Sequence, residues 1–472
     1  MARIVLISPP YLQDYMRNAR CDFVSLSKSN WFPIWLGQAG SWLEAKGHKT
    51  RLMDAQVAGL TKEQAFDEIR AFGPDVVAVY TGRLSEESDL AFADEVAATG
   101  RTVALVGPYA SIDPRALLAK ARRARIAIKG EFDLPLEELA DGKAPQGLAG
   151  FVIRDEQTGE IVGNAERPLY KSDILAQFPS TAAYFHRQLD VARYKTPSEP
   201  HPFVDVMSGR GCAWGRCNFC LWVQTFVPGS VYNLRPIEQF MEEFEYVTRF
   251  MPEVRGIMIQ DDMLTRPRAA EISEAILERG YKIQWSCYAK PNSRLDQATF
   301  ELMRRAGCLN LHVGFESGDD EVLERIDKGA TVAQSREFVR LAHAAGLNIH
   351  GDFAMGHLGE TKESMQRTID LARELDPHTA QFQVMIPFQG TIFQRQLDEL
   401  GAWSPSGEPD YSASGGASSE EIRATAKSGY RQFYFSRSYL QKIVSRPREY
   451  FFNRFDQYAR AIPAVTWRRW VK

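Results

Sequence analysis

The chain has 472 residues, of which 44% are hydrophobic and 25% charged, and its formal net charge is −3. This balance is typical of a globular protein and excludes disordered and fibrous classes. No apolar run reaches the ~20 residues that span a bilayer, and residues 1–3 pass directly into the strand-like IVLI without a signal-peptide pattern. We therefore expect a cytoplasmic protein. The length predicts two domains plus appendages.

Residues 1–145 alternate short β-branched runs with amphipathic stretches. The runs RIVLIS, KTRLMDA, VVAVYTG, TVALVGPY and IAIKGE predict strands, and helices are expected near 35–46, 62–71 and 86–98. This alternation predicts a doubly wound, Rossmann-like α/β domain.

Small or rigid residues follow the predicted strands of this domain. Ligands of open parallel sheets bind at the carboxyl ends of the strands. No GxGxxG opens the first helix, so a dinucleotide is not favoured. The candidate ligand-binding residues of these loops are Ser8, Pro9, Pro10, Thr81, Gly82, Gly107, Pro108, Tyr109, Gly130 and Glu131.

Residues 146–202 are interpreted as a connector. They begin with alternating residues around Gln157-Thr158-Gly159, a pattern that predicts a hairpin. Four prolines then interrupt regular structure: Pro179, Pro197, Pro200 and Pro202.

Residues 203–400 again alternate strand and helix. Six runs predict strands: FVDVMSG, GIMIQDDM, KIQWSCYA, NLHVGFESG, NIHGDFAMG and TAQFQVMIPF. Helices are expected at 236–250, 268–279, 296–306, 332–345 and 361–375. Together these units predict a partial (β/α)6 barrel, whose functional residues would collect at the carboxyl ends of its strands.

Three cysteines crowd the loop after the first barrel strand, at Cys212, Cys217 and Cys220. Three thiolates are one short of a closed zinc or iron–sulfur site, so a four-iron cluster held here would keep one iron open to another ligand. The alternative is a zinc site with a distant fourth ligand. The candidates for that ligand are Cys287, Cys308, His312 and His350.

The cysteines, together with Phe219 and the segments IQDDM, GFESG and GDFAMGHLGET, resemble the radical S-adenosylmethionine (SAM) superfamily. The resemblance implies a [4Fe–4S] cluster whose open iron is chelated by the amino and carboxylate groups of SAM. Reduction then splits SAM into methionine and a 5′-deoxyadenosyl radical. The SAM-binding residues that it implies are Phe219, Asp261, Asp262, Ser286, Glu316, Ser317 and Pro387.

The chain departs from the family pattern at two positions. Its cysteines are spaced CxxxxCxxC, where CxxxCxxC is usual. In the fifth unit, His357-Leu358 replace the common Leu-Pro, so His357 is a candidate for binding substrate or handling a proton, the alternative being a solvated turn histidine.

The N-terminal domain resembles the cobalamin-binding domain found upstream of many radical SAM enzymes, through VGPYAS and IKGEFDLPLEEL. The resemblance implies that the loop residues at the ends of its strands bind cobalamin. No DxHxxG segment is present, so cobalt would lack a protein histidine beneath it. The alternative is a Rossmann-like domain that packs on the barrel or binds substrate.

The C-terminal region, residues 401–472, passes from a Ser/Gly-rich stretch into a basic, aromatic-rich segment that predicts helices. Residues 421–472 contain twelve Lys or Arg against three acids. We favour a cap on the barrel over a peripheral membrane contact, and a membrane contact over nucleic acid.

The aromatic-rich segment near residues 18–48 resembles enzymes related to the anaerobic magnesium-protoporphyrin ester cyclase and to hopanoid-associated radical SAM proteins. This branch implies a small-molecule or lipid-linked substrate and an electron donor such as flavodoxin or ferredoxin. The leading hypothesis is methylation of an unactivated carbon. The alternatives are a cyclisation, rearrangement or oxidation without methyl transfer and, from another class, a zinc-holding RNA-binding protein.

Overall fold

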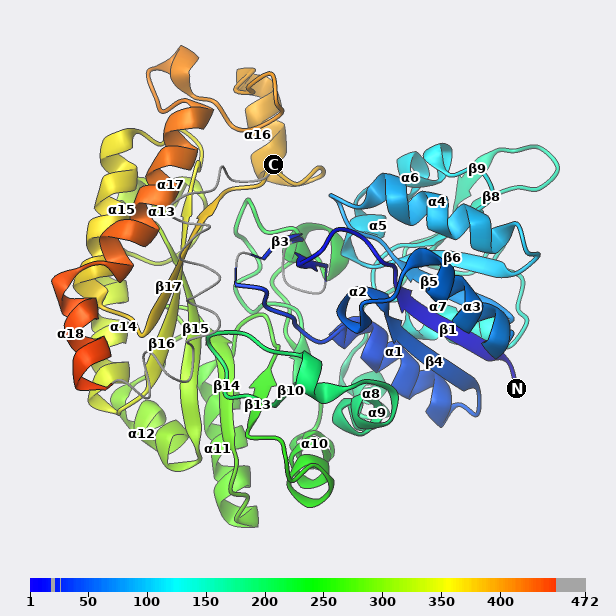
Figure 1. Cartoon of the computed structure of the whole chain (residues 1–472), viewed down its shortest axis with the longest axis horizontal. Coiled ribbons are helices and arrows are strands. Elements are labelled where there is room, and N and C mark those ends of the chain that lie inside the picture. The colour runs from blue at the N-terminus through cyan, green and yellow to red at the C-terminus, as the bar shows by residue number, and fades with distance from the viewer. Residues whose placement is uncertain (18–21, 26, 447–472) are drawn as a thin grey trace.

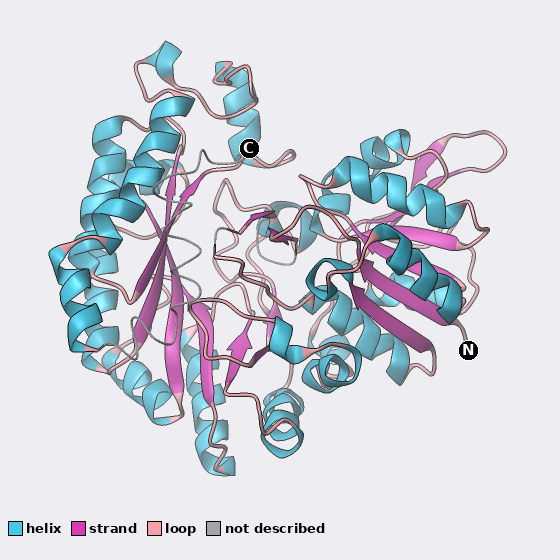
Figure 2. Cartoon of the chain, viewed as in Figure 1, coloured by secondary structure: helices cyan, strands magenta, loops and turns pink. Residues whose placement is uncertain are grey.

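The computed structural model describes residues 1–17, 22–25 and 27–446, which form two α/β units. In Figure 1 the barrel lies on the left and the N-terminal unit on the right, with strand β3 between them. Figure 2 shows that helices cover the outer side of the barrel sheet, while loops fill the space where the two units meet.

The N-terminal sheet has the strand order β4-β1-β5-β6-β7-β8-β9, and its first five strands are parallel. Val, Ile, Leu and Ala dominate these strands, as expected where helices cover both faces of a sheet. The five parallel strands are β1 (Arg3–Ser8), β4 (Lys49–Asp54), β5 (Val76–Tyr80), β6 (Thr102–Val106) and β7 (Ile126–Ile128). The predicted doubly wound sheet is confirmed.

The helices predicted in this unit are confirmed within two residues at each end. They are α1 (Ile34–Ala45), α3 (Lys62–Phe72) and α4 (Glu86–Ala97), and shorter helices are α2 (Ala55–Ala58), α5 (Pro108–Ile112), α6 (Pro114–Lys120) and α7 (Asp133–Ala140). Helix α1 is buried along nearly its whole length. Its Gly37 and Gly40 admit the rings of Phe185 and Tyr184, because a Cβ at either glycine would lie 2.3 Å from the facing ring.

The predicted hairpin is present, and it extends the N-terminal sheet. Strand β8 (Phe151–Arg154) pairs antiparallel with β7, and β9 (Ile161–Gly163) pairs with β8. The sheet thus continues to residue 163, past the domain boundary expected at residue 145. The rest of the connector forms α8 (Ser172–Leu175), α9 (Thr181–Gln188) and the 3-10 turn η1 (Val191–Arg193).

The barrel sheet is six-stranded and parallel, in the order β10-β13-β14-β15-β16-β17, which confirms the predicted partial barrel. Its strands are β10 (Phe203–Val206), β13 (Gly256–Ile259), β14 (Gln284–Ala289), β15 (Cys308–Glu316), β16 (Asn348–Met355) and β17 (Thr379–Val384). Its helices are α10 (Ile237–Phe250), α11 (Arg266–Arg279), α12 (Gln297–Arg305), α13 (Asp320–Arg325), α14 (Val332–Ala344) and α15 (Lys362–Leu375).

Smaller elements lie where the two units meet. They are the hairpin β2 (Tyr15–Met16) with β3 (Phe23–Val24), the ribbon β11 (Gly209–Arg210) with β12 (Asn233–Leu234), and the π-helix η2 (Trp222–Phe226).

The C-terminal region continues the cover of the barrel with α16 (Ile392–Leu400), η3 (Ser412–Ser414), α17 (Ser419–Tyr434) and α18 (Arg437–Ser445). Helix α17 packs on β17: a Cβ at Gly429 would lie 2.8 Å from the Phe382 ring, and the Tyr434 hydroxyl donates to Ala380 O at 2.9 Å. The second half of the predicted basic tail, residues 447–472, lies outside the described residues. Within the described ranges, no helix combines the length and apolarity needed to cross a bilayer.

Candidate functional site

The carboxyl ends of the two sheets face each other. The Arg83 guanidinium, after β5, lies 5.8 Å from the centre of the Phe388 ring, after β17. A Cβ at Gly390 would lie 3.3 Å from Ile112 Cγ2 in α5. Because ligands of both fold types bind at these ends, the two candidate cofactor sites adjoin one another.

The cysteine loop lies between β10 and α10 and is shaped by side-chain hydrogen bonds to its own backbone. The Gln224 amide donates to Cys217 O at 3.2 Å, to Asn218 O at 2.7 Å and to Cys220 O at 3.2 Å. The three cysteines are half-buried. The loop therefore presents its thiols from a backbone that is already fixed.

The extra residue in the first cysteine interval has a structural explanation. Trp214 donates its indole N–H to Asp327 O at 2.7 Å, and the centre of its ring lies 4.1 Å from Lys290 Nζ. Gly215 follows with φ +59°, and a Cβ there would lie 2.2 Å from Gly229 O. The longer interval accommodates the Trp214 ring and the tight turn that returns the chain to Cys217.

Two opposing influences act on the ionisation of the thiols: burial disfavours the thiolate, and nearby lysines favour it. Burial raises the pKa of the Cys220 thiol to about 12, and it also raises the pKa of Cys217, an effect opposed by Lys328 and Lys290. Burial lowers the pKa of Lys290 to about 8, and its Nζ has no hydrogen-bond partner among the described residues. Because metal ligation requires thiolates, bound iron and these two lysines would all lower the pKa of the cysteine thiols.

The residues considered as a fourth zinc ligand are engaged elsewhere. Cys287 is buried in β14 and its thiol interacts with that of Cys308. His312 is bonded to Glu199 and His350 to Thr379. Across the described residues, no three His, Cys, Asp or Glu side chains are grouped to hold a single ion. Three cysteines without a fourth ligand fit a four-iron cluster with one open iron.

The two aspartates after β13 have different surroundings. Both oxygens of Asp261 are used within the protein: Oδ1 accepts from Ser208 N at 2.6 Å and Gly209 N at 3.2 Å, while Oδ2 accepts from the Ser208 and Tyr232 hydroxyls. Asp262 is half-exposed and close enough to Cys220 to raise the pKa of that thiol. Of the pair, Asp262 fits a ligand ammonium and Asp261 fits a role in fixing the start of the cysteine loop.

Glu316, the last residue of β15, remains a candidate for binding SAM. It has φ +63°, a conformation that costs a residue with a Cβ and tends to occur at functional sites. Its carboxylate lies 2.7 Å from Lys328 Nζ and remains 12% exposed. Ser317 is instead fully buried, with its hydroxyl 3.2 Å from Thr368 Oγ1.

Ser286 lies in the middle of β14, and its hydroxyl donates to Glu199. Glu199 comes from the connector and also contacts His312 Nε2 at 2.6 Å. The Ser286 hydroxyl is therefore engaged below the level of Glu316, away from the ends of the strands.

His357 is completely buried, which excludes the solvated turn histidine. Its ring centre lies 5.4 Å from that of Phe219, and neither ring nitrogen has a hydrogen-bond partner among the described residues. Burial, with Lys328 and Arg325 nearby, lowers the pKa of His357 to about 3, so the ring is neutral at physiological pH. Pro387 lies in the loop after β17, next to the buried Phe388.

Glu360 closes the loop that contains His357 and gives a pH-dependent prediction. Its carboxylate accepts from Gly356 N at 2.7 Å and His357 N at 3.0 Å, and burial raises its pKa from 4.5 to about 8. Between these values the folded chain keeps a proton that the unfolded chain releases, so stability falls as pH rises from 4.5 to 8. In thermal melts across this range we expect E360Q to lose most of that dependence.

The exposed Glu363, one turn away, provides the matched control, and E363Q should keep the wild-type dependence. Equal slopes for E360Q and the wild type would contradict the assignment.

The candidate cobalamin residues gather at the carboxyl edge of the N-terminal sheet. The parallel strand order places the topological switch point between β1 and β5, which end at Ser8 and at Thr81-Gly82. Gly107 follows the adjacent β6 with φ +105°. The only histidine of residues 1–145, His48, accepts from Ala2 N at the opposite end of the sheet. The small residues of these loops would let a corrin approach the backbone closely.

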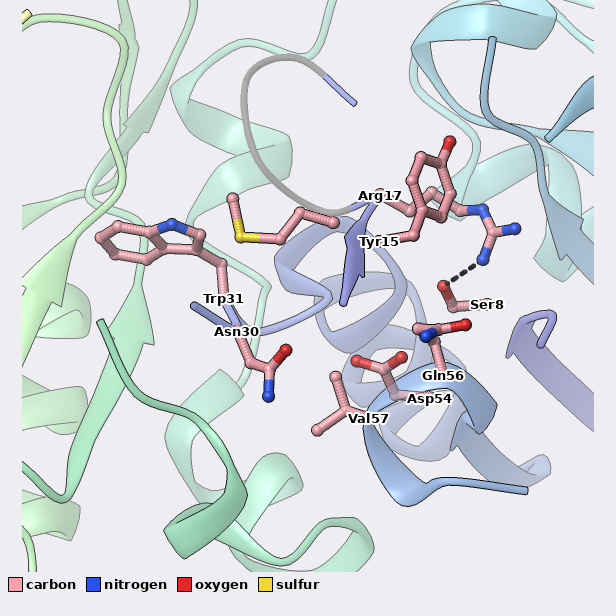
Figure 3. Close-up of a pocket in the computed structure, with 9 residues that line it drawn as sticks. Ser8, Tyr15, Arg17, Asn30, Trp31, Asp54, Gln56 and Val57 are labelled. Atoms are coloured by element: carbon pink, nitrogen blue, oxygen red, sulfur yellow. Dashed lines mark hydrogen bonds between the residues drawn. The ribbon is translucent and has the colours of Figure 1, made fainter. Parts of the chain in front are cut away.

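A strap, whose described residues are 9–17, 22–25 and 27–33, passes over this edge. Arg17 donates to Ser8 Oγ at 3.1 Å and to Asp89 at 2.7 Å, and the Tyr15 hydroxyl donates to Asp22 at 2.6 Å. A cavity of about 10 Å³, room for one water molecule, lies beneath the strap beside Asp54 (Figure 3).

Four other predicted residues of this edge have defined surroundings. Pro9 O accepts from Arg17 at 2.6 Å, and the Tyr109 hydroxyl donates to Glu86. Pro10 is half-buried beside Pro9, and Pro108 is buried at the first position of α5. A corrin at this edge would contact the backbone of these loops more than their side chains.

Gly130 and Glu131 follow β7 and differ from the other predicted residues. A Cβ at Gly130 would lie 3.5 Å from Phe226 O in the barrel unit. Glu131 Oε1 lies 2.8 Å from Arg210 Nη1, and its Oε2 accepts from Tyr170 N at 2.8 Å. Both oxygens of Glu131 are thus engaged within the protein.

Sequence reasoning missed the residues that connect the units. Arg210 is fully buried, contacts Glu131 and Asp133 at 2.8 Å and donates to Gln38 Oε1 at 2.7 Å. Lys328 was also missed as a neighbour of the cysteines, and Lys290 was expected only to face the cavity from the end of its strand. No sequence spacing relates these residues, because β7, β11 and the two lysine loops meet only in the folded chain.

Two regions match known protein families. Residues 206–372 match the Radical SAM superfamily, and residues 20–140 match the B12 binding domain. An uncharacterized methyltransferase, PH0819, from Pyrococcus horikoshii is 27% identical over 368 residues, which cover 76% of this chain and 77% of the relative. The anaerobic magnesium-protoporphyrin IX monomethyl ester cyclase of Rubrivivax gelatinosus is 23% identical, covering 89% and 77%.

A solved structure has the same fold over nearly the whole chain. The cobalamin-dependent radical SAM enzyme OxsB, with aqua-cobalamin and SAM bound, superposes with a TM-score of 0.72 at 15% identity, covering 97% of this chain and 72% of OxsB. The two family matches assign a [4Fe–4S] cluster, SAM and cobalamin as cofactors. The chain therefore combines a B12-binding domain with a radical SAM domain, the combination that defines a cobalamin-dependent radical SAM enzyme.

Proposed function

We propose that this enzyme methylates an unactivated carbon of a small-molecule substrate. The observation that carries the proposal is the pairing of two edges: the edge of the barrel that bears the three-cysteine loop, for which the described residues offer no fourth ligand, meets the carboxyl edge of a B12-binding domain. The name of the 27% identical relative from Pyrococcus horikoshii, a methyltransferase, supports the same reaction.

Each part of the site has a proposed task. Cys212, Cys217 and Cys220 hold the cluster, and Asp262 and Glu316 bind the ammonium and the ribose of SAM. The loops that contain Ser8, Thr81, Gly82 and Gly107 hold cobalamin by close backbone approach. When bound, the cluster with SAM supplies a carbon radical, and cobalamin supplies the methyl group.

Neutral surroundings protect a radical in this arrangement. The rings of His357 and Phe219 lie with their centres 5.4 Å apart, and Phe388, after β17, is buried where the barrel faces Arg83 of the N-terminal unit. These groups exclude water, while Lys328 neutralises Glu316. The enzyme requires a one-electron reductant, for which flavodoxin or ferredoxin is our proposal.

The test is the product balance of anaerobically reconstituted enzyme with SAM, cobalamin, reductant and substrate fractions. Methylation should produce both S-adenosylhomocysteine and 5′-deoxyadenosine, together with a product heavier than its substrate by one CH₂. Formation of 5′-deoxyadenosine without S-adenosylhomocysteine or added mass would contradict methyl transfer.

That contrary result would favour the second candidate, a cyclisation or rearrangement in which no methyl group is transferred. The 23% identical relative from Rubrivivax gelatinosus is a cyclase by name and covers most of this chain. Stoichiometric zinc without iron would instead support the RNA-binding hypothesis.

A further inference from the structure

Two rows of residues cross neighbouring strands of the barrel, the first over four strands and the second over three. Strand register defines the first row as Tyr288, His312, His350 and Thr379, and the second row as Gly314, Asp352 and Gln381. The second row lies nearer the carboxyl ends of the strands. Apart from Gly314, every member of the two rows has a hydrogen-bonding side chain.

Both rows face away from the covering helices. The alternate residues Phe353 and Phe382 stack with their ring centres 5.4 Å apart, and Phe382 packs against Gly429 of α17. Because successive side chains of a strand point to opposite faces, His350, Asp352 and Gln381 lie on the inner face of the barrel.

The first row is a connected polar cluster. His312 Nε2 lies 2.6 Å from Glu199 Oε1, and the rings of His312 and His350 have their centres 5.0 Å apart. His350 Nδ1 lies 2.7 Å from Thr379 Oγ1, and its Nε2 lies 3.4 Å from Asp352 Oδ1. The hydrogen bonds of this cluster fix the orientation of the two imidazoles.

Two residues from outside the barrel, Trp31 and Glu199, cover His312 on the side away from the carboxyl ends of the strands. Trp31, from the strap, lies with its ring centre 5.8 Å from that of His312 and 5.6 Å from that of Phe203. Figure 3 shows the Trp31 ring at the opposite side of the close-up from Ser8. Trp31 and Glu199 together form a floor beneath His312.

Exposure increases from this floor to Asp352 in the second row. The side chain of His312 is 3% exposed, that of His350 14% and that of Asp352 25%. Glu316, at the end of β15, is 12% exposed. Solvent therefore reaches the second row on the same sheet that presents Glu316, as a substrate-facing surface requires.

The polar side chains of this surface favour a ligand that forms hydrogen bonds. An apolar chain placed against Asp352, His350 and Gln381 would remove water from these groups without replacing its hydrogen bonds. A carboxylate accepts hydrogen bonds and does not donate them, so the partner of Asp352 must donate. A hydroxyl or amino group meets this requirement and a hydrocarbon tail does not.

We propose that the substrate enters the barrel by a polar end whose hydroxyl or amino groups are bound by Asp352 and His350. This inference rests on the proposed function and names its substrate class: a hydrophilic small molecule in place of the apolar or lipid-linked one suggested by the aromatic-rich N-terminal segment.

The first experiment compares two extracts of the source cells as probes, one aqueous and one in chloroform. Reconstituted enzyme receives SAM with a deuterated methyl group, and formation of 5′-deoxyadenosine is measured with each extract. The aqueous extract is expected to stimulate it several-fold. Stimulation by the chloroform extract alone would overturn the inference.

The label separates this inference from the proposed reaction. Stimulation by the aqueous extract without transfer of the deuterated methyl group would leave the polar substrate class standing and contradict methylation. Transfer of the label to a chloroform-soluble product only would support methylation and overturn the substrate class.

A variant pair tests the residue assignment. In D352N the amount of aqueous extract needed for half-maximal stimulation should rise about 10-fold to 100-fold, because a hydrogen bond to a charged acceptor is lost. Asp370 on the outer face of α15 is 57% exposed, and D370N should respond like the wild type. Equal responses of D352N and the wild type would contradict a role for Asp352 in binding.

Discussion

Replacing Cys217 by alanine is expected to lower the iron content of the reconstituted enzyme from about four atoms per chain to below one. Two thiolates cannot hold a four-iron cluster against loss, and the Cys217 thiol lies where Lys328 and Lys290 favour its ionised form. Formation of 5′-deoxyadenosine should fall at least about a thousandfold, because without the cluster no electron reaches SAM. Iron analysis and chromatography of the nucleoside measure the two effects.

Cys287 is the matched control for this substitution. It is fully buried in β14 and interacts with Cys308, remote from the loop. C287A should keep about four irons per chain. A cluster that survives C217A but is lost in C287A would place the ligands elsewhere.

The second large effect is expected from R210M. Arg210 is the cation between Glu131 and Asp133, and all three side chains are at most 3% exposed. Removing one member of a buried ion pair leaves the other charge desolvated and typically costs about 3–5 kcal/mol. We therefore expect the free energy of unfolding in urea to fall by this amount.

Arg336 supplies the control because it makes a comparable pair with Glu374, at 2.6 and 3.0 Å, on the exposed surface of the barrel. R336M should change stability by less than about 1 kcal/mol. If R210M and R336M had equal effects, the buried pair would not contribute to holding the units together.

The order of strands and helices could be predicted because local signals agree with the fold. The strands of the N-terminal sheet include β-branched runs such as Val76–Tyr80, and helices α3, α14 and α17 begin with capping boxes of the pattern S/T-x-x-E/Q. The π-helix after Cys220 and the buried helix α9 were not predicted. Their sequences have no periodicity that separates them from loops.

The residues of the candidate site also fall into two groups, those that sequence position identifies and those whose role only the fold reveals. The cysteines, Asp262 and Glu316 stand at strand ends, where position alone indicates a role. Asp261, Ser286 and Glu131 have the same residue types at similar positions, but their polar atoms are occupied by partners from distant segments such as Tyr232, Glu199 and Arg210. Only the fold reveals those partners.

The strap has a consequence for how such enzymes diversify. It begins at the B12-binding edge, where Arg17 is fixed to Asp89, and it ends inside the barrel unit, where Phe32 N donates to Asp205 at 3.2 Å and Trp31 faces His312. In the substrate site proposed above, the N-terminal unit would thus contribute part of the wall. Exchanging this unit for that of a relative is therefore expected to alter substrate choice as well as the cofactor site.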